Sequence, residues 1–115
     1  MLRKSPSRTA ARRPAYAPVF AALGDETRLL LIANLSAGEP RSISQLTQGH
    51  KVTRQAITKH LRILESAGLV RGERSGRRSL FELDPRPIME LREYLDLVSA
   101  QWDQALSRLK SFVEA

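Results

Sequence analysis

The chain has no cysteine among its 115 residues. That absence excludes disulfides, thiolate metal ligands, cysteine nucleophiles and thiol-based redox sensing together. No apolar run approaches the roughly 18 residues that a membrane-spanning helix needs, and the N-terminus has no apolar segment of the kind found in secretory signals. The sequence therefore predicts a cytoplasmic protein with a single ordinary core.

Acidic side chains are scarce in two segments, and the net charge of +7 is concentrated there. Residues 51–78 contain eight basic side chains against two acidic ones, and residues 1–14 contain five basic side chains and no acidic one. A concentrated basic patch attracts a polyanion by electrostatic steering and counterion release. Charge that serves solubility alone is spread more evenly over both signs. The pattern favours a nucleic acid as the partner.

Residues 1–14 are rich in Arg, Ser, Pro and Ala and offer almost no apolar surface to bury. We expect this basic tail to be disordered and the folded domain to span residues 15–115. Three interpretations of the tail stay open: an arm that touches DNA phosphates, a passive tail, or an organellar transit peptide of similar composition.

Three helices are expected before residue 50. Apolar residues at 19, 20 and 23 predict a first helix from Tyr16 to Gly24. Asp25 is a favoured N-cap residue for a second helix, which should end at the Gly-Glu-Pro of residues 38–40. A short third helix is expected over residues 44–47. The second helix should bury a broad apolar stripe, which consists of Leu29, Leu30, Ile32, Ala33 and Leu35.

The most informative stretch is a fourth helix that Thr53 caps and Gly68 ends. Ile57, Leu61 and Leu64 recur at spacings of four and three, which predicts one buried face. The opposite face is polar and cationic, with Arg54, Gln55, Thr58, Lys59 and Arg62. Such a helix after a tight turn suits the width of the DNA major groove.

A β-hairpin and a long helix complete the chain. Strands are expected over residues 69–74 and 79–83, joined by a turn over 75–78 whose tip is rich in arginine. The last helix should be about 28 residues long, because an apolar seam recurs with alternating spacings of three and four. That seam consists of Ile88, Leu91, Leu95, Val98, Trp102, Ala105, Leu109 and Phe112. The predicted fold class is α+β and mostly α: a winged helix-turn-helix with about five helices and a two-stranded wing.

The candidate DNA-binding residues follow from this layout. The first turns of the fourth helix should reach base edges, and the arginines of the hairpin should meet phosphates or the minor groove. His60 should make a phosphate or a packing contact. The full set is Thr53, Arg54, Gln55, Thr58, Lys59, His60, Arg62, Arg74, Arg77 and Arg78.

These motifs together resemble the ArsR family of winged-helix repressors. The LGDETR of residues 23–28 resembles the family's L-[AGS]-[DN]-x-T-R opening. The TRQAITKHLRIL of 53–64, with AGLV at 67–70, is similar to the recognition helix and its exit, and RSGRR at 74–78 with FEL at 81–83 matches the wing. The resemblance covers about residues 16–113. It implies a homodimeric repressor that binds an inverted-repeat operator and is released by an inducing signal.

The resemblance also implies that the first and last helices form the dimer. The apolar seam of the last helix is longer than one winged-helix body can cover, which favours the same conclusion. The candidate dimerisation residues are Val19, Phe20, Leu91, Leu95, Val98, Trp102 and Leu109.

The sequence departs from the metal-sensing members of that family. Where they carry Cys-x-Cys, this chain has Ser42-Ile43-Ser44, and where another site begins with Asp-x-His, it has Asp84-Pro85-Arg86 with no histidine after His60. Hydroxyls and an arginine do not replace thiolates and imidazoles as ligands. We expect no metal and no cofactor, and a place in a metal-independent branch that has a tryptophan where Trp102 stands.

Other function classes fit less well. No nucleophile, base and orienting residue form a set, so we do not expect an enzyme. A basic RNA-binding module would present exposed aromatics for base stacking, but the chain has only six aromatic residues. A protein that acts only through helix-mediated protein interaction would leave the arginine-tipped hairpin without a role.

Overall fold

The computed structural model describes residues 16–114, so the predicted basic tail lies outside the described residues. The described part falls into two units, the first ending at Pro85 and the second beginning at Arg86. No helix within residues 16–114 combines the length and the apolar character needed to cross a bilayer.

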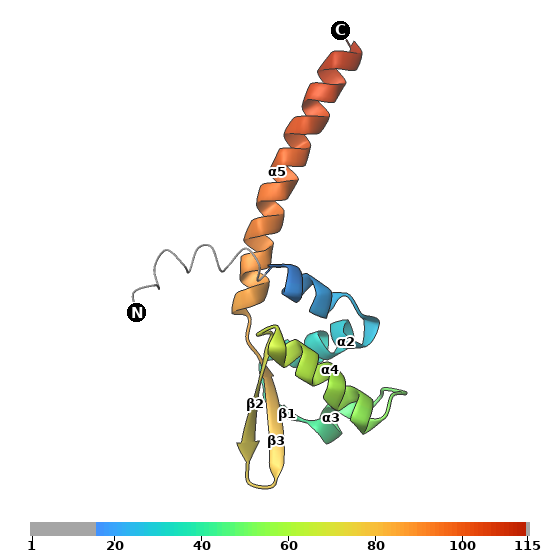
Figure 1. Cartoon of the computed structure of the whole chain (residues 1–115), viewed down its shortest axis with the longest axis vertical. Helices are drawn as coiled ribbons and strands as arrows, with labels where there is room; N and C mark the ends of the chain where they lie inside the picture. Colours follow the sequence, from blue (N-terminus) through green and yellow to red (C-terminus); the bar gives the residue numbers. More distant parts are fainter. Residues whose placement is uncertain (1–15, 115) are drawn as a thin grey trace, which may run out of the picture. The chain divides into compact units, whose positions relative to one another are not determined.

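Five helices and three strands make up the described residues, which confirms the mostly helical α+β prediction (Figure 1). After a helix over residues 16–23, the first unit contains α2 (Glu26–Leu35), β1 (Arg41–Ser42), α3 (Ile43–Thr47), α4 (Arg54–Ser66), β2 (Val70–Ser75) and β3 (Arg78–Leu83). The second unit is one continuous helix, α5 (Arg86–Glu114).

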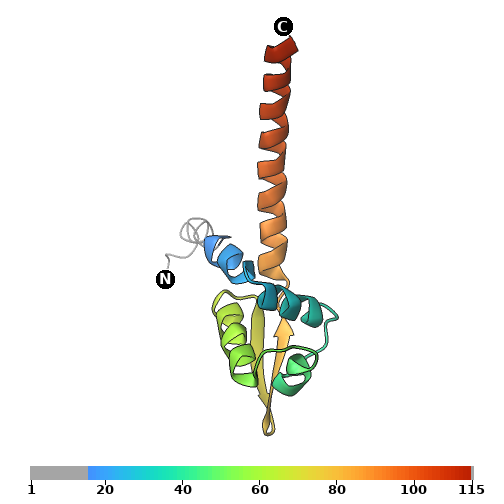
Figure 2. The ribbon, with the colours of Figure 1, turned by 90° about the vertical axis from the view of Figure 1, so that its right-hand side faces the viewer.

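β2 and β3 form the predicted two-stranded wing, and β1 extends it to a three-stranded antiparallel sheet in the order β1-β3-β2. The additional strand, β1, pairs Arg41 with Phe81 and Ser42 with Leu80. Two residues are too few to show the alternation that reveals a strand, and β1 exists only because β3 offers it a free edge. The helices of this unit gather on one face of the sheet (Figure 2).

The core of the first unit lies between those helices and the sheet. Its side chains are apolar, each with almost no exposed surface, and they come from every layer of the unit: Leu31, Leu35, Leu46, Ile57, Leu61, Leu64, Leu69, Val70 and Phe81. The predicted buried face of α4 is confirmed, because its three apolar positions are all fully buried. One side of α4 is therefore fixed inside the unit.

The predicted apolar stripe of α2 is partly wrong. Leu29 and Leu30 are 52% and 53% exposed, whereas Leu31, Ile32 and Leu35 are buried. A helix of ten residues buries one stripe along its length, and that stripe passes through 31, 32 and 35. Leu29, Leu30, Leu31 and Ile32 are consecutive in the sequence, so packing against the other elements decides which of them is buried.

The third helix begins one residue earlier than predicted, at Ile43. Ser42 is its N-cap residue: the Ser42 hydroxyl accepts from the Gln45 N–H, and the Gln45 side-chain oxygen accepts from the Ser42 N–H. This reciprocal pair is a capping box, and its Ser-x-x-Gln signature was visible in the sequence.

Both ends of α4 are fixed as the sequence predicted. The Thr53 hydroxyl accepts from the Ala56 N–H at 3.1 Å. At the other end, Gly68 takes a φ of +80°, and the N–H groups of Gly68 and Leu69 donate to the carbonyls of Glu65 and Leu64. This Schellman motif ends α4 and leads the chain directly into β2.

Arg28 joins the end of the first helix to α4. Its guanidinium donates to the carbonyl oxygens of Ala22 at 2.6 Å and Ala21 at 3.4 Å, and Nη1 lies 3.1 Å from Nδ1 of His60. Because a guanidinium has no acceptor, Nδ1 must accept this bond. Arg28 is therefore a cross-link between two elements that are distant in sequence.

Asp25 completes this junction as the N-cap of α2. Its carboxylate accepts from the Arg28 N–H at 3.1 Å and lies 3.8 Å from Nδ1 of His60. The pKa of the Asp25 carboxyl lies below its ordinary value of 3.8, chiefly because the Arg28 backbone N–H donates to it, with the charge of the Arg28 guanidinium acting in the same direction.

A lowered pKa makes the contribution of Asp25 to stability depend on pH. The contribution is fully present above the ordinary value of 3.8 and is lost as the pH falls through the lowered pKa. We expect Asp25→Asn, which keeps a capping side chain without the charge, to be less stable than the native chain at about pH 7 and to approach it at about pH 2. Urea unfolding at both pH values measures the difference, with Glu39→Gln as the control. A difference that does not depend on pH would contradict the assignment.

Candidate nucleic-acid interface

The outward face of α4 is polar and cationic. Gln55, Lys59 and Arg62 are exposed, on the side opposite the three buried apolar residues of this helix. Gln55 and Lys59 have no side-chain partner within residues 16–114, whereas Arg62 forms an ion pair with Glu65 at 3.1 Å. The fold thus presents two unengaged long polar side chains, one turn apart, to solvent.

Two predicted base-reading residues are already engaged within the protein. The Arg54 guanidinium donates from Nη1 to the Ser44 hydroxyl at 2.8 Å, which bends this side chain toward α3. The Thr58 hydroxyl donates to the Arg54 backbone carbonyl at 2.8 Å. Thr58 therefore has its methyl group left for an apolar contact, and Arg54 lies at the margin of the outward face.

His60 lies away from the other candidates. Its side chain is only 22% exposed, and its Nδ1 is held in the junction with Arg28 and Asp25. We therefore assign His60 to the positioning of α4. The sequence motif at residues 23–28 contained the signal for this junction, but a motif does not show which helix its arginine reaches.

The wing places three arginines beside α4. Arg74 in β2 and Arg78 in β3 belong to adjacent rungs of the hairpin, and Arg77 follows Gly76 in the turn. Gly76 has a φ of +64°, a conformation suited to the first central position of a tight hairpin turn. Arg74 donates from Nε to the Gly76 carbonyl at 3.5 Å. All of these arginines are exposed.

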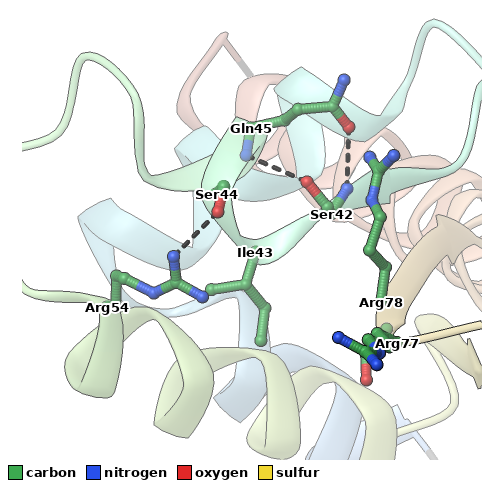
Figure 3. Close-up of a pocket in the computed structure, with 8 residues that line it drawn as sticks. Ser42, Ile43, Ser44, Gln45, Arg54, Arg77 and Arg78 are labelled. Carbon is green, nitrogen blue, oxygen red and sulfur yellow. Dashed lines mark hydrogen bonds between the residues drawn. The ribbon is translucent and has the colours of Figure 1, made fainter.

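A cleft of about 500 Å³ lies between α3, the start of α4 and the wing. Arg54 enters it from α4, and Arg77 and Arg78 enter it from the wing (Figure 3). Ser44, which sequence reasoning did not single out for DNA binding, holds Arg54 at its edge. The fold thus brings together three of the ten predicted DNA-binding residues in one hollow.

Residues 42–44 of this cleft stand where metal-sensing members of the family carry Cys-x-Cys, so their chemistry decides whether the chain could hold a metal there. The Ser42 hydroxyl is used in the capping box, and the Ser44 hydroxyl accepts from Arg54. A guanidinium 2.8 Å from a would-be ligand repels a cation. Nowhere in residues 16–114 do three His, Asp or Glu side chains come together to hold a metal ion. The residues at 42–44 do not fit a metal site.

Much of the apolar seam of α5 is exposed. Leu95, Trp102 and Leu109 are about half exposed or more, and Phe112 is 80% exposed. Val98 and Ala105, between them, are half-buried. Of the predicted dimerisation residues, Val19 and Leu91 have almost no exposed surface.

The chain is similar to known proteins in both sequence and structure. A helix-turn-helix domain family matches residues 23–73. An HTH-type transcriptional regulator of Mycobacterium tuberculosis is 32% identical over 94 residues, covering 82% of this chain and 84% of that protein.

Solved structures give the same result. An ArsR-like transcriptional regulator from Rhodococcus sp. RHA1 is 34% identical and has a TM-score of 0.74, covering 89% of this chain and 95% of that one. A homodimeric winged helix-turn-helix DNA-binding domain from Mycobacterium bovis, described as a possible ArsR-family regulator, is 25% identical with a TM-score of 0.64, covering 88% and 92%. With a capped, cationic α4, an arginine-tipped wing and relatives of this kind, the chain belongs to the ArsR family of winged helix-turn-helix transcriptional regulators.

Proposed function

We propose that this regulator is a homodimeric repressor that binds a two-fold symmetric operator, with α4 in the major groove and the wing on the neighbouring backbone. The observation that carries the proposal is the two-sided character of α4. Its apolar side is fully buried while its other side presents Gln55 and Lys59 to solvent. Repression is the mode that the family resemblance implies.

Base reading is assigned to the middle of the outward face. A glutamine amide can pair with N6 and N7 of adenine, and a lysine can donate to O6 and N7 of guanine. The Thr58 methyl group suits the methyl of thymine. Arg74 at the wing is assigned to phosphates or the minor groove, because an exposed arginine on a hairpin tip reaches along the duplex.

Dimerisation is assigned to α5 together with the first helix. Leu95, Trp102 and Leu109 repeat every seven residues along α5 and are all substantially exposed, a pattern typical of a helix that packs on a partner helix. Phe20 adds exposed apolar surface on the first helix. The related domain from Mycobacterium bovis is a homodimer. A dimer of this kind requires half-sites about one helical turn apart, roughly 10 base pairs, or a multiple of that.

The assignment of Gln55 to bases predicts a loss of specificity. Gln55→Ala should weaken binding to the cognate duplex by about 1–3 kcal/mol and relax discrimination at one base pair of each half-site. Arg74→Ala should weaken cognate and scrambled duplexes equally and flatten the salt dependence of binding, because only a phosphate contact is lost. Titrations over a salt series measure both effects, and Gln104→Ala on α5 serves as the control. The roles are reversed if the wing variant alone loses discrimination.

The assignment of the dimer predicts a position-specific effect on α5. Leu95→Asp should dissociate the dimer because it places an unpaired charge in the seam. Leu97→Asp is the matched control: Leu97 is 58% exposed, but it lies outside the seam of the heptad and should leave the dimer intact. Sedimentation at micromolar concentration gives the oligomeric state. A native chain that sediments as a monomer, or dissociation by Leu97→Asp alone, contradicts the proposed seam.

A further inference from the structure

The cleft between α3, α4 and the wing is lined by one kind of charge. Three guanidinium groups line it, from Arg54, Arg77 and Arg78, and the other lining side chains are uncharged. Ser42 and Gln45 at its rim are tied to each other in the capping box. No carboxylate lies among the lining residues, so nothing in the cleft neutralises the three cations.

Other arginines of this region are neutralised within the protein. Arg62 pairs with Glu65 at 3.1 Å, and Arg71 pairs with Glu82 at 3.3 Å. Within residues 16–114, neither Arg77 nor Arg78 has an acidic partner. Three like charges brought together from two segments, α4 and the wing, repel one another, and an anion placed among them relieves that repulsion.

Arg54 is oriented for such an anion by the protein itself. Nη1 donates to the Ser44 hydroxyl at 2.8 Å, which fixes the guanidinium plane at the edge of the cleft and leaves its other N–H groups available (Figure 3). A planar guanidinium fork matches the oxygens of a phosphate in a two-point contact. Because Ser44 already holds the Arg54 guanidinium in the free protein, less conformational entropy is lost when this side chain contacts the anion.

We propose that this cleft binds one phosphate group of the DNA backbone in each half-site, with Arg54, Arg77 and Arg78 as its ligands. Arg54 is then a phosphate ligand and not a base reader. The inference rests on the proposed function, because the cleft lies between α4 and the wing, the two elements assigned to the duplex. A backbone phosphate is favoured over a free phosphate because a duplex lying on α4 carries its own phosphates past the elements that flank that helix.

The test uses the full chain and a cognate duplex selected from a random-sequence library. Each phosphate near the half-sites is replaced in turn by a neutral methylphosphonate. For the native chain, neutralising one phosphate per half-site should weaken binding about tenfold per contact. Arg54→Ala should weaken cognate and scrambled duplexes by the same factor, lower the salt slope by about two for the dimer, and remove the effect of that one methylphosphonate.

Two further variants separate the loss of the cleft guanidinium from the loss of positive charge in general. Arg71→Ala removes one guanidinium charge, as Arg54→Ala does, but from a residue of β2 outside the cleft, and it should leave the methylphosphonate effect intact. Arg54→Lys keeps the charge without the fork, so it should restore the salt slope while recovering only part of the affinity. Circular dichroism of each variant confirms that it is folded.

The outcomes separate this inference from the proposed function. If the native chain selects no duplex, both are overturned. If it selects one but Arg54→Ala behaves as Arg71→Ala does, or loses discrimination at one base pair, the cleft is not the phosphate site and the proposed function stands. Inorganic phosphate added without DNA distinguishes the other source. Stoichiometric shifts of the Arg54 and Arg77 side-chain NMR signals at low millimolar phosphate would make the cleft a free-anion site and overturn the assignment to DNA.

Discussion

Burial of one side of α4 is the constraint on which the interface depends. Ile57, Leu61 and Leu64 have no exposed surface. Truncating any one of them to alanine would lower the free energy of unfolding by about 2–5 kcal/mol. A helix with three such residues on one side cannot roll about its axis without exposing them. The orientation of Gln55 and Lys59 toward solvent therefore follows from packing on the far side of the same helix.

The Arg28 junction adds a polar constraint to this apolar one. Packing fixes the rotation of α4, and hydrogen bonds add a restraint that depends on direction. The Arg28 guanidinium is held by the carbonyls of Ala21 and Ala22 and reaches His60 in the middle of α4. These hydrogen bonds connect the first helix, which we assign to the dimer, to α4, which we assign to the operator. In the proposed dimer, the spacing of the two α4 helices thus depends on Arg28, whose hydrogen bonds lie within one chain.

Local signals predicted most of the fold. Thr53 and Gly68 gave the two ends of α4 because capping chemistry depends on a few neighbouring residues, and the heptad spacing gave the length of α5 to within a residue or two. Long-range features were less accessible: β1 has no pattern of its own, and the choice between Leu30 and Leu31 on α2 depends on what packs against it. The candidate site follows the same division. The cationic face of α4 was visible in the sequence, whereas the bend of Arg54 toward Ser44 required the structure.

The Schellman motif at Gly68 also affects how a regulator with this fold dissociates from its operator. Only residues 67–69 separate α4 from β2, and both residues after the turn's glycine, Leu69 and Val70, are buried. This connection is too short for α4 to move while the hairpin keeps its position. A displacement of α4 must carry the wing with it, so in the proposed complex the two sets of DNA contacts break in one step. Dissociation of the proposed complex is then a switch between two states, with no partly attached form in which the wing alone holds the duplex.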